Sequence, residues 1–376
     1  MTSEAVFKDL LVLELASVLA GPSVGQFFAE LGAKVIKVEN AATGGDVTRT
    51  WKLKSEKADT DAPAYFCAVN WGKTSLALDL TQASDLTHLH TLVRQADVVL
   101  ASYKPGDAEK LQVDFATLQC LNPRLIYGHI TGYGAHDDRA GYDAVVQAES
   151  GFMYLNGPAD GAPTKMPVAL IDVLAAHQLK EGLLVALLQR ERTGAGQLVQ
   201  VSLLAAAVSA LVNQATSYLV AGHNPQRMGS EHPSIVPYGS VYTSKDQKQL
   251  VLAIGDDRQF RRLCAVLDAP LLADDTRFST NYNRVQHRSD LNQQLQQLIA
   301  QQEREPLLQA LRRQHVPAGA INTVAEVFEQ PLPRQLLLHA PDALPGIRQV
   351  AFQISGQNLP ALDPPPHYNS AQPNQV

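Results

Sequence analysis

The most constraining feature of this sequence is a regular alternation of short apolar runs and helical patterns through its first half. Apolar runs at residues 10–14 and 34–38 flank a helical pattern that begins near Pro22 and ends at Gly32. The alternation continues with predicted strands at 75–80, 97–100 and 125–130 and predicted helices at 85–95 and 116–121. Strands that alternate with helices imply an α/β fold, in which helices cover both faces of a parallel sheet.

The chain has 376 residues, a length typical of two domains. Its composition changes after Gly222, where residues 223–238 are rich in Pro, Gly, His and Ser and read as a linker or binding loop. A strand pair at 240–243 and 249–254 and three amphipathic helices then indicate a smaller α+β unit. We therefore predict a large domain over residues 1–222 and a small domain, with its linker, over 223–331.

Charge and cysteine content exclude several classes of protein. The net charge is −6, so the chain has no basic footprint for nucleic acid. Three widely separated cysteines form neither a disulfide framework nor a zinc cluster, and the first ten residues lack an export pattern. These features predict a cytoplasmic protein.

One segment, residues 193–222, contains no Asp, Glu, Lys or Arg. Its many Gln, Asn, Ser and Thr side chains disfavour a membrane span. We expect a strand at 198–201 and a long buried helix from Leu203, with no membrane partner.

Asp172 is the single residue that the sequence marks most clearly as a candidate functional residue. The apolar run at 168–171 predicts a strand that delivers Asp172 to the start of a long helix over 173–192. Asp at a helix start is commonly a cap. Alternatively, a carboxylate at the carboxyl edge of a parallel sheet lies where such folds bind ligands, and desolvation would make it a better nucleophile. The residue alone leaves both interpretations open.

Two other segments are candidates for ligand contact. Lys104 and Lys110 follow a predicted strand end, in either a solvated turn or a loop that faces phosphate. Glu39 ends the first strand–helix–strand unit, as the ribose-binding acid of a dinucleotide fold does. However, the loop at 20–25 lacks the G-x-G-x-x-G pattern, which disfavours nicotinamide or flavin binding.

A series of short motifs, in a fixed order over about two hundred residues, resembles the family III CoA-transferases of the formyl-CoA and carnitine CoA-transferase type. The motifs are 18–22 (VLAGP), 31–39 (LGAKVIKVE), 45–49 (GDVTR), 70–73 (NWGK), 78–80 (LDL), 96–98 (ADV), 104–106 (KPG), 122–126 (NPRLI), 131–134 (TGYG), 141–143 (GYD), 147–151 (QAESG) and 192–197 (RTGAGQ).

The resemblance implies a Rossmann-like large domain, completed by residues 332–376, and an interlocked homodimer. It implies that the chain transfers CoA from an acyl-CoA thioester to a free carboxylic acid, with no metal and no tightly bound cofactor. Asp172 would be the catalytic aspartate, and Asp143 would help to position it. The oxyanion donors could be backbone N–H groups at Gly134 and Gly151. The expected CoA contacts are Leu19, Ala20, Glu39, Asn40, Ser102, Tyr103, Lys104, Lys110, Leu111 and Tyr142.

Two alternatives remain within the same family. α-Methylacyl-CoA racemases pair a histidine with the aspartate in an Ala-Gly-His-Asp context, whereas this chain has Tyr142 before Asp143. Tyrosine, with an ordinary pKa near 10, is a poor base at neutral pH, which favours the transferase. The second alternative is a catalytically silent CoA-binding homologue, which the presence of Asp172 disfavours.

Overall fold

The computed structural model describes residues 5–341, 343 and 345–371 and divides into two compact units. The first unit contains Met1–Phe152, Lys165–His223 and Leu332–Val376, and the second contains Met153–Thr164 and Asn224–Pro331. Residues 153–164 therefore group with the smaller unit rather than with the large domain expected from composition. Residues 1–4 and 372–376 of the predicted large domain lie outside the described residues.

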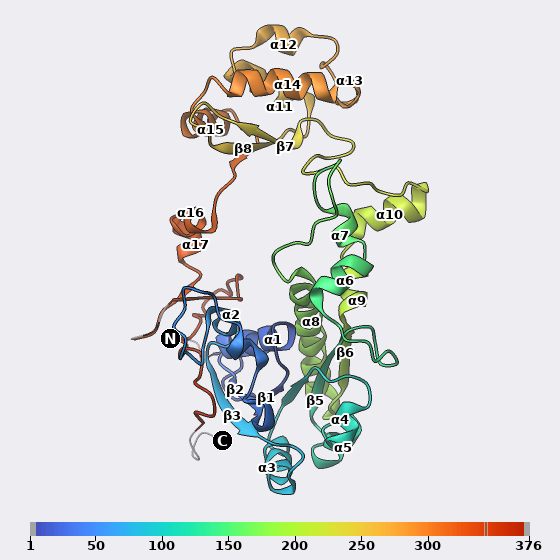
Figure 1. Cartoon of the computed structure of the whole chain (residues 1–376), viewed down its shortest axis with the longest axis vertical. Helices are drawn as coiled ribbons and strands as arrows, with labels where there is room; N and C mark the ends of the chain where they lie inside the picture. Colours follow the sequence, from blue (N-terminus) through green and yellow to red (C-terminus); the bar gives the residue numbers. More distant parts are fainter. Residues whose placement is uncertain (1–4, 342, 344, 372–376) are drawn as a thin grey trace. The chain divides into compact units, whose positions relative to one another are not determined.

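A six-stranded parallel sheet forms the centre of the first unit (Figure 1). Its strands, in the spatial order β3-β2-β1-β4-β5-β6, are β1 (Leu11–Leu15), β2 (Lys34–Asn40), β3 (Lys73–Leu78), β4 (Val98–Ala101), β5 (Ile126–Thr131) and β6 (Leu198–Ser202). Val12 of β1 pairs with Val35 of β2 on one side and with Val98 of β4 on the other. The strand order reverses at β1, which is the arrangement of a doubly wound Rossmann-like fold. The predicted α/β class with a parallel sheet is confirmed.

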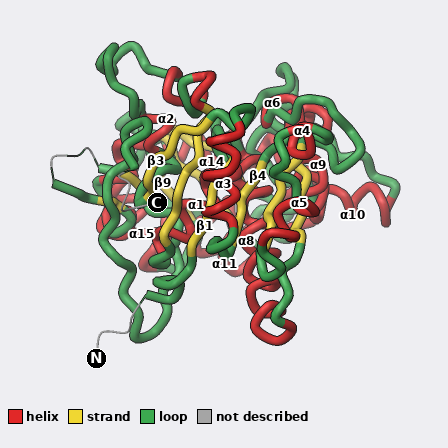
Figure 2. The backbone as a smooth tube through the Cα atoms, turned by 90° about the horizontal axis from the view of Figure 1, so that it is seen from below, coloured by secondary structure: helices red, strands yellow, loops and turns green. Residues whose placement is uncertain are grey.

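Helices cover both faces of this sheet. One face packs against α1 (Ala20–Glu30), α8 (Leu170–Thr193) and α9 (Leu203–Ser209), and the other against α3 (Ala83–Val93) and α5 (Phe115–Leu121). Figure 2 shows α3 and α5 in front of the strands. Helix α1 begins two residues before Pro22 and ends before Gly32, whose φ of +98° closes the helix as predicted.

The remaining short elements of the first unit lie in its loops and its last segment. They are η1 (Ala41–Thr43), η2 (Val47–Thr50), α2 (Ala64–Cys67), α4 (Asp107–Lys110), α6 (Asp143–Glu149), α10 (Val212–Ala221), β10 (Leu337–Leu338) and β11 (Gly346–Ile347), with α7 (Phe152–Leu155) and α17 (Pro331–Arg334) crossing its boundaries.

The predicted strand at residues 168–171 is wrong. Helix α8 begins at Leu170, and Ile171 is buried in the core, whereas Val168 is 59% exposed. The main chain at 166 and 168 bonds to the Gln147 side chain rather than to a neighbouring strand. Asp172 is therefore the third residue of α8, not its N-cap.

The predicted long buried helix after Leu203 is also wrong, because two helices form there. Helices α9 and α10 meet at an angle of 70°, and α10 buries none of its residues in the described chain. Within the described ranges, no single helix is long and apolar enough to cross a membrane, although the bent pair α9 and α10 meets that test when taken together.

The second unit has a three-stranded antiparallel sheet, in the order β7-β8-β9, and a helical layer. Its elements are β7 (Tyr238–Thr243), β8 (Gln249–Ala253), α11 (Asp257–Val266), α12 (Pro270–Asp274), α13 (Asn281–Gln286), α14 (Arg288–Ile299), α15 (Arg304–Arg313), β9 (Ala318–Ala320) and α16 (Val324–Phe328). Leucines of α14 and α15 pack with strand residues Leu250 and Leu252 in its core. The predicted strand pair and amphipathic helices all form.

The described end of the chain packs onto the first unit along β3. Ala371 donates its backbone N–H to the carbonyl of Ser75 at 2.8 Å, and Ala77 donates to Oδ1 of Asn369 at 3.0 Å. Because these bonds cover the outer edge of β3, the last segment protects an edge strand that would otherwise be open to pairing.

Candidate active site

A cavity of about 710 Å³ lies in the first unit, where β1, β4 and β5 end. Its lining includes Asp172 and Asp143, together with residues that follow the three strands, namely Ser17, Ser102 and Gly132. Open parallel sheets bind ligands outside the carboxyl ends of their strands, near the point where the strand order reverses. The structure thus brings the two predicted acids together at the edge where this fold places a site.

A second cavity of about 550 Å³ adjoins the first. It lies beyond the ends of β2 and β3, and both cavities are lined by Ser17, Ser102 and Tyr103. Their shared wall defines an elongated site along one sheet edge, suited to a long ligand whose reactive end reaches Asp172.

Asp172 combines burial with a position in the first turn of α8. Its side chain is only 9% exposed, and no described residue donates a hydrogen bond to its carboxylate. Burial, and then the negative charge of Asp143, raise the pKa of Asp172 to about 7. A carboxylate with so high a pKa is a stronger nucleophile than an ordinary one, and about half of it is ionised near neutral pH.

Asp143 is the first residue of α6, and its carboxylate accepts a hydrogen bond from a backbone N–H in the first turn of α8. Its Oδ1 accepts a hydrogen bond from the backbone N–H of Ile171 at 2.8 Å, and its Oδ2 accepts one from Nε2 of Gln147 at 2.7 Å. The capping that sequence reasoning considered for Asp172 is therefore done by Asp143. This leaves the Asp172 carboxylate available to a ligand.

Gln147, one turn further along α6, holds the segment that leads into α8. The side chain is 1% exposed, and its Oε1 accepts the backbone N–H of Met166 at 2.9 Å. Its Nε2 also lies 3.4 Å from the carbonyl oxygens of Met166 and Val168. Together, Asp143 and Gln147 fix the main chain immediately before Asp172.

The residues predicted to contact CoA fall into four groups. Leu19, Ala20, Lys104 and Tyr142 line the cavity that contains Asp172, and Glu39, Asn40 and Leu111 line the second cavity. Ser102 and Tyr103 line both. Lys110 lines neither cavity. It pairs with Asp107 at 2.9 Å on the surface.

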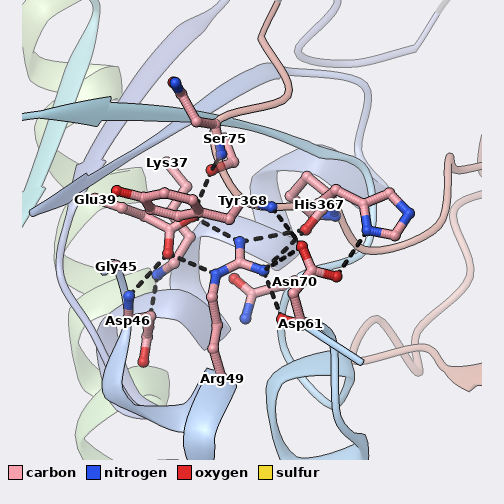
Figure 3. A network of polar contacts seen from close by, with 12 residues as sticks. Lys37, Glu39, Gly45, Asp46, Arg49, Asp61, Asn70, Ser75, His367 and Tyr368 are labelled. Carbon is pink, nitrogen blue, oxygen red and sulfur yellow. Dashed lines mark hydrogen bonds and ion pairs between the residues drawn. The ribbon is translucent and has the colours of Figure 1, made fainter. Parts of the chain in front are cut away.

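Glu39 belongs to a buried ion-pair network behind the second cavity (Figure 3). Burial alone would raise the pKa of Glu39, but the Arg49 guanidinium, Ser75 and the backbone N–H of Asp46 hold it below its ordinary value. Arg49 approaches Glu39 to 2.6 Å and also bonds to the carbonyl of Pro366. Both oxygens of Glu39 already accept internal bonds, so its carboxylate shapes the cavity wall and ties it to the last segment of the chain.

Among the residues of the Asp172 cavity that sequence reasoning missed are two aromatic residues and a lysine. Trp51 and Tyr65 form an edge-to-face pair with ring centroids 4.9 Å apart, and Lys165 lies on the segment before α8. Burial and the charges of Asp172 and Asp143 raise the pKa of Tyr65, so its phenol keeps its proton. Tyr65 lies in the short helix α2, and Trp51 directly follows η2. Both are more than one hundred residues from Asp172, and no local pattern marks them.

Gly134 and Gly151 do not line the cavity that contains Asp172. Gly132 and Gly141 line it instead, and a Cβ built on Gly132 would lie 2.6 Å from the Cα of Gly141. The close contact of two backbones, rather than a free N–H group, is what requires glycine here.

Comparison with known proteins places the chain in a family. The model of CoA-transferase family III matches residues 7–372. The chain is 41% identical, over 85% of its length and 81% of the relative, to the succinate–glutarate CoA-transferase of Agrobacterium fabrum. It is 34% identical to the acetyl-CoA:oxalate CoA-transferase of Acetobacter aceti, over 86% of this chain and 83% of that one.

A solved structure agrees with these relatives. A CAIB/BAIF family protein from Brucella suis is 39% identical, with a TM-score of 0.85 over 96% of this chain and 95% of that one. The protein belongs to CoA-transferase family III, which confirms the resemblance found in its motifs.

Proposed function

We propose that this protein transfers CoA from an acyl-CoA thioester to a free carboxylic acid, and that Asp172 is the covalent nucleophile. The observation that carries the proposal is a buried carboxylate, with a raised pKa, in the larger of the two adjoining cavities along the carboxyl edge of the sheet. Membership of the family supplies the class of reaction.

The first half of the reaction follows from a carboxylate that attacks a thioester. One Asp172 oxygen bonds to the acyl carbonyl carbon, and the C–S bond breaks. CoA leaves as a thiolate, and the acyl group remains joined to Asp172 as a mixed anhydride. The thiolate then attacks the Asp172 carbonyl, which releases the donor acid and leaves an aspartyl-CoA thioester.

The second half reverses these steps with a different acid. The acceptor carboxylate attacks the aspartyl thioester and forms a new anhydride while CoA thiolate leaves. The thiolate then attacks the acceptor acyl carbon, which yields the new acyl-CoA and restores the Asp172 carboxylate. No net proton transfer is needed, so the pocket has only to present an ionised carboxylate and stabilise oxyanions.

The adjoining cavities suit a CoA thioester. We infer that the nucleotide end occupies the cavity near Asn40 and Leu111, and that the pantetheine chain passes Ser102 and Tyr103 toward Asp172. Succinate, glutarate and oxalate in the names of two relatives are dicarboxylic acids. Small dicarboxylic acids are therefore the first donors and acceptors to test.

Trapping with hydroxylamine tests the nucleophile. The wild-type protein, incubated with succinyl-CoA and then hydroxylamine, is expected to carry a hydroxamate on the peptide that contains Asp172. Asp172→Asn keeps the size of the side chain but removes the attacking charge, so it is expected to bind acyl-CoA without transferring it. Turnover by Asp172→Asn, free of deamidation, would show that the nucleophile lies elsewhere.

Two measurements on the same protein, hydrogen exchange and CoA transfer, distinguish the racemase from the silent homologue. Tyr142 lines the cavity and is 65% exposed. It stands at the position where the racemases have a histidine. We expect a 2-methylacyl-CoA to gain no deuterium from heavy water, while CoA moves between acids. Rapid exchange at the 2-position would indicate racemase chemistry, and no reaction of either kind would indicate a silent homologue.

We also propose a homodimer, because apolar side chains remain uncovered in the single chain. Val212, Leu219 and Val220 of α10 are 63%, 75% and 84% exposed, and Val185 and Leu188 of α8 are 57% and 56% exposed. Large apolar side chains that are exposed in this number are typical of a subunit interface. Light scattering at micromolar concentration is expected to give twice the mass of one chain, and a stable monomer would refute the dimer.

A further inference from the structure

Three cationic residues line the cavity that contains Asp172, namely Lys104, Arg139 and Lys165, and they differ in their partners. Arg139 is neutralised internally, because its guanidinium pairs with Asp137 at 2.9 Å and with Glu149 at 3.2 Å. It also lies over the Tyr133 ring at 3.7 Å. Its donors are largely committed to protein groups.

Lys104 is exposed and directly follows Tyr103, the residue that lines both cavities. Its place directly after the shared wall assigns it to the path of the CoA chain rather than to the acyl end. Of the three cations, Lys165 alone lies on the segment that leads directly into α8 and Asp172.

Lys165 is partly buried and lacks a carboxylate partner. Its Nζ donates to the carbonyl of Met166 at 2.7 Å, and among the described residues no Asp or Glu oxygen lies within ion-pair distance of it. An ammonium group has three donors, so two remain for a ligand. A partly desolvated cation without a counter-charge favours an anionic group in the cavity.

The position of Lys165 is well defined even though its side chain is long. Gln147 holds both the N–H and the C=O of the next residue, Met166, and Asp143 holds the start of α8. Lys165 and Asp172 line the same cavity, and no ion pair joins them among the described residues.

We propose that Lys165 binds the second carboxylate of a dicarboxylic substrate, while the first, as thioester or free acid, meets Asp172. The inference rests on the proposed CoA transfer and adds to it the residue that recognises the remote charge. A monocarboxylic acid of equal length would leave the ammonium group without its partner.

The matched substrates are succinyl-CoA and butyryl-CoA, which differ by a terminal carboxylate in place of a methyl group. With wild type we expect a clear preference for succinyl-CoA in kcat/KM. Lys165→Met is expected to reduce this preference on the order of tenfold or more by acting on succinyl-CoA alone, because a hydrogen bond to a charged group is lost. Lys165→Arg keeps the charge and is expected to restore most of the preference.

A binding measurement separates this proposal from the identity of the nucleophile. In Asp172→Asn, calorimetry is expected to show tighter binding of succinyl-CoA than of butyryl-CoA, and the double variant with Lys165→Met is expected to lose the difference. Free CoA is expected to bind both variants equally, since Lys165 is not assigned to its phosphates.

The outcomes are distinct. Equal losses with both thioesters, or weaker binding of free CoA, would overturn the role of Lys165 while leaving CoA transfer intact. A wild type that shows no preference, in turnover or in binding, would overturn it as well. Turnover by Asp172→Asn would instead refute the proposed nucleophile and leave the binding comparison valid.

Discussion

The carboxylate of Asp143 accepts a hydrogen bond from the backbone N–H of Ile171 at 2.8 Å. Ile171 immediately precedes Asp172, so one acid caps the helix that presents the other. The same carboxylate supplies the negative charge that, after burial, contributes most to the raised pKa of Asp172. Asp143 therefore helps to position the proposed nucleophile and adds to the rise in its pKa that burial causes.

Asp143→Asn is expected to move the acidic limb of the kcat/KM profile to lower pH. Wild type should gain activity as pH rises through about 7, because Asp172 must be ionised to attack. Removing the neighbouring charge lowers the pKa of Asp172, but burial keeps it above its ordinary value. Asp137→Asn, which removes a carboxylate that lines the same cavity but pairs with Arg139, serves as the control. An unchanged acidic limb would contradict the electrostatic role of Asp143.

Asp172→Asn is expected to stabilise the protein at pH 8 and to leave its stability unchanged near pH 4. The folded state raises the pKa of Asp172 from 3.8 to about 7, so the native protein binds more protons than the unfolded chain between these values. Stability therefore falls as pH rises through this window, by at most about 4 kcal/mol from this group. Urea unfolding at pH 4, 6 and 8 measures the difference, and an equal effect at all three values would refute it.

Gln147→Leu is expected to lower activity and to reduce stability by about 1–3 kcal/mol. The change leaves Asp143 Oδ2 and the Met166 N–H without their buried partner. Because the segment before α8 then loosens, kcat should fall more than KM rises. Gln178→Leu, on an exposed surface of α8, is the control. Full activity in Gln147→Leu would show that Asp143 alone positions the helix.

Arg49→Met is expected to destabilise the protein by about 3–5 kcal/mol at pH 7, since it leaves the buried Glu39 carboxylate unpaired. In wild type the pKa of Glu39 is held low, so its contribution is present at neutral pH and lost as pH falls. The deficit should therefore shrink toward pH 4, where Glu39 of the variant is protonated.

Lys110→Met provides the matched comparison for Arg49→Met. Its pair with Asp107 is exposed and screened by solvent, so its loss is expected to change stability far less than the loss of Arg49. Thermal unfolding of both variants at several pH values tests the contrast. Equal effects would show that the Glu39 network contributes no more than a surface pair.

The sequence by itself determined most of the large unit. The strands β1 to β5 form within two residues of their predicted bounds because each is a short apolar run between breakers, a pattern that acts locally. The ordered motifs placed the chain in its family and pointed to Asp172. A local pattern could not distinguish a strand at 168–171 from a helix start, because only the contacts with Gln147 decide between them.

Only the tertiary structure decided what surrounds Asp172. Tyr65 precedes Asp143 in the sequence and Lys165 follows it, yet both line the same cavity. Neither residue belongs to a local sequence pattern. The ion pair between Arg49 and Glu39 likewise depends on tertiary contacts, and so does the bend between α9 and α10. Periodicity reports which face of an element is buried, whereas the pKa of a carboxylate and the partner of a cation depend on groups that folding alone brings within reach.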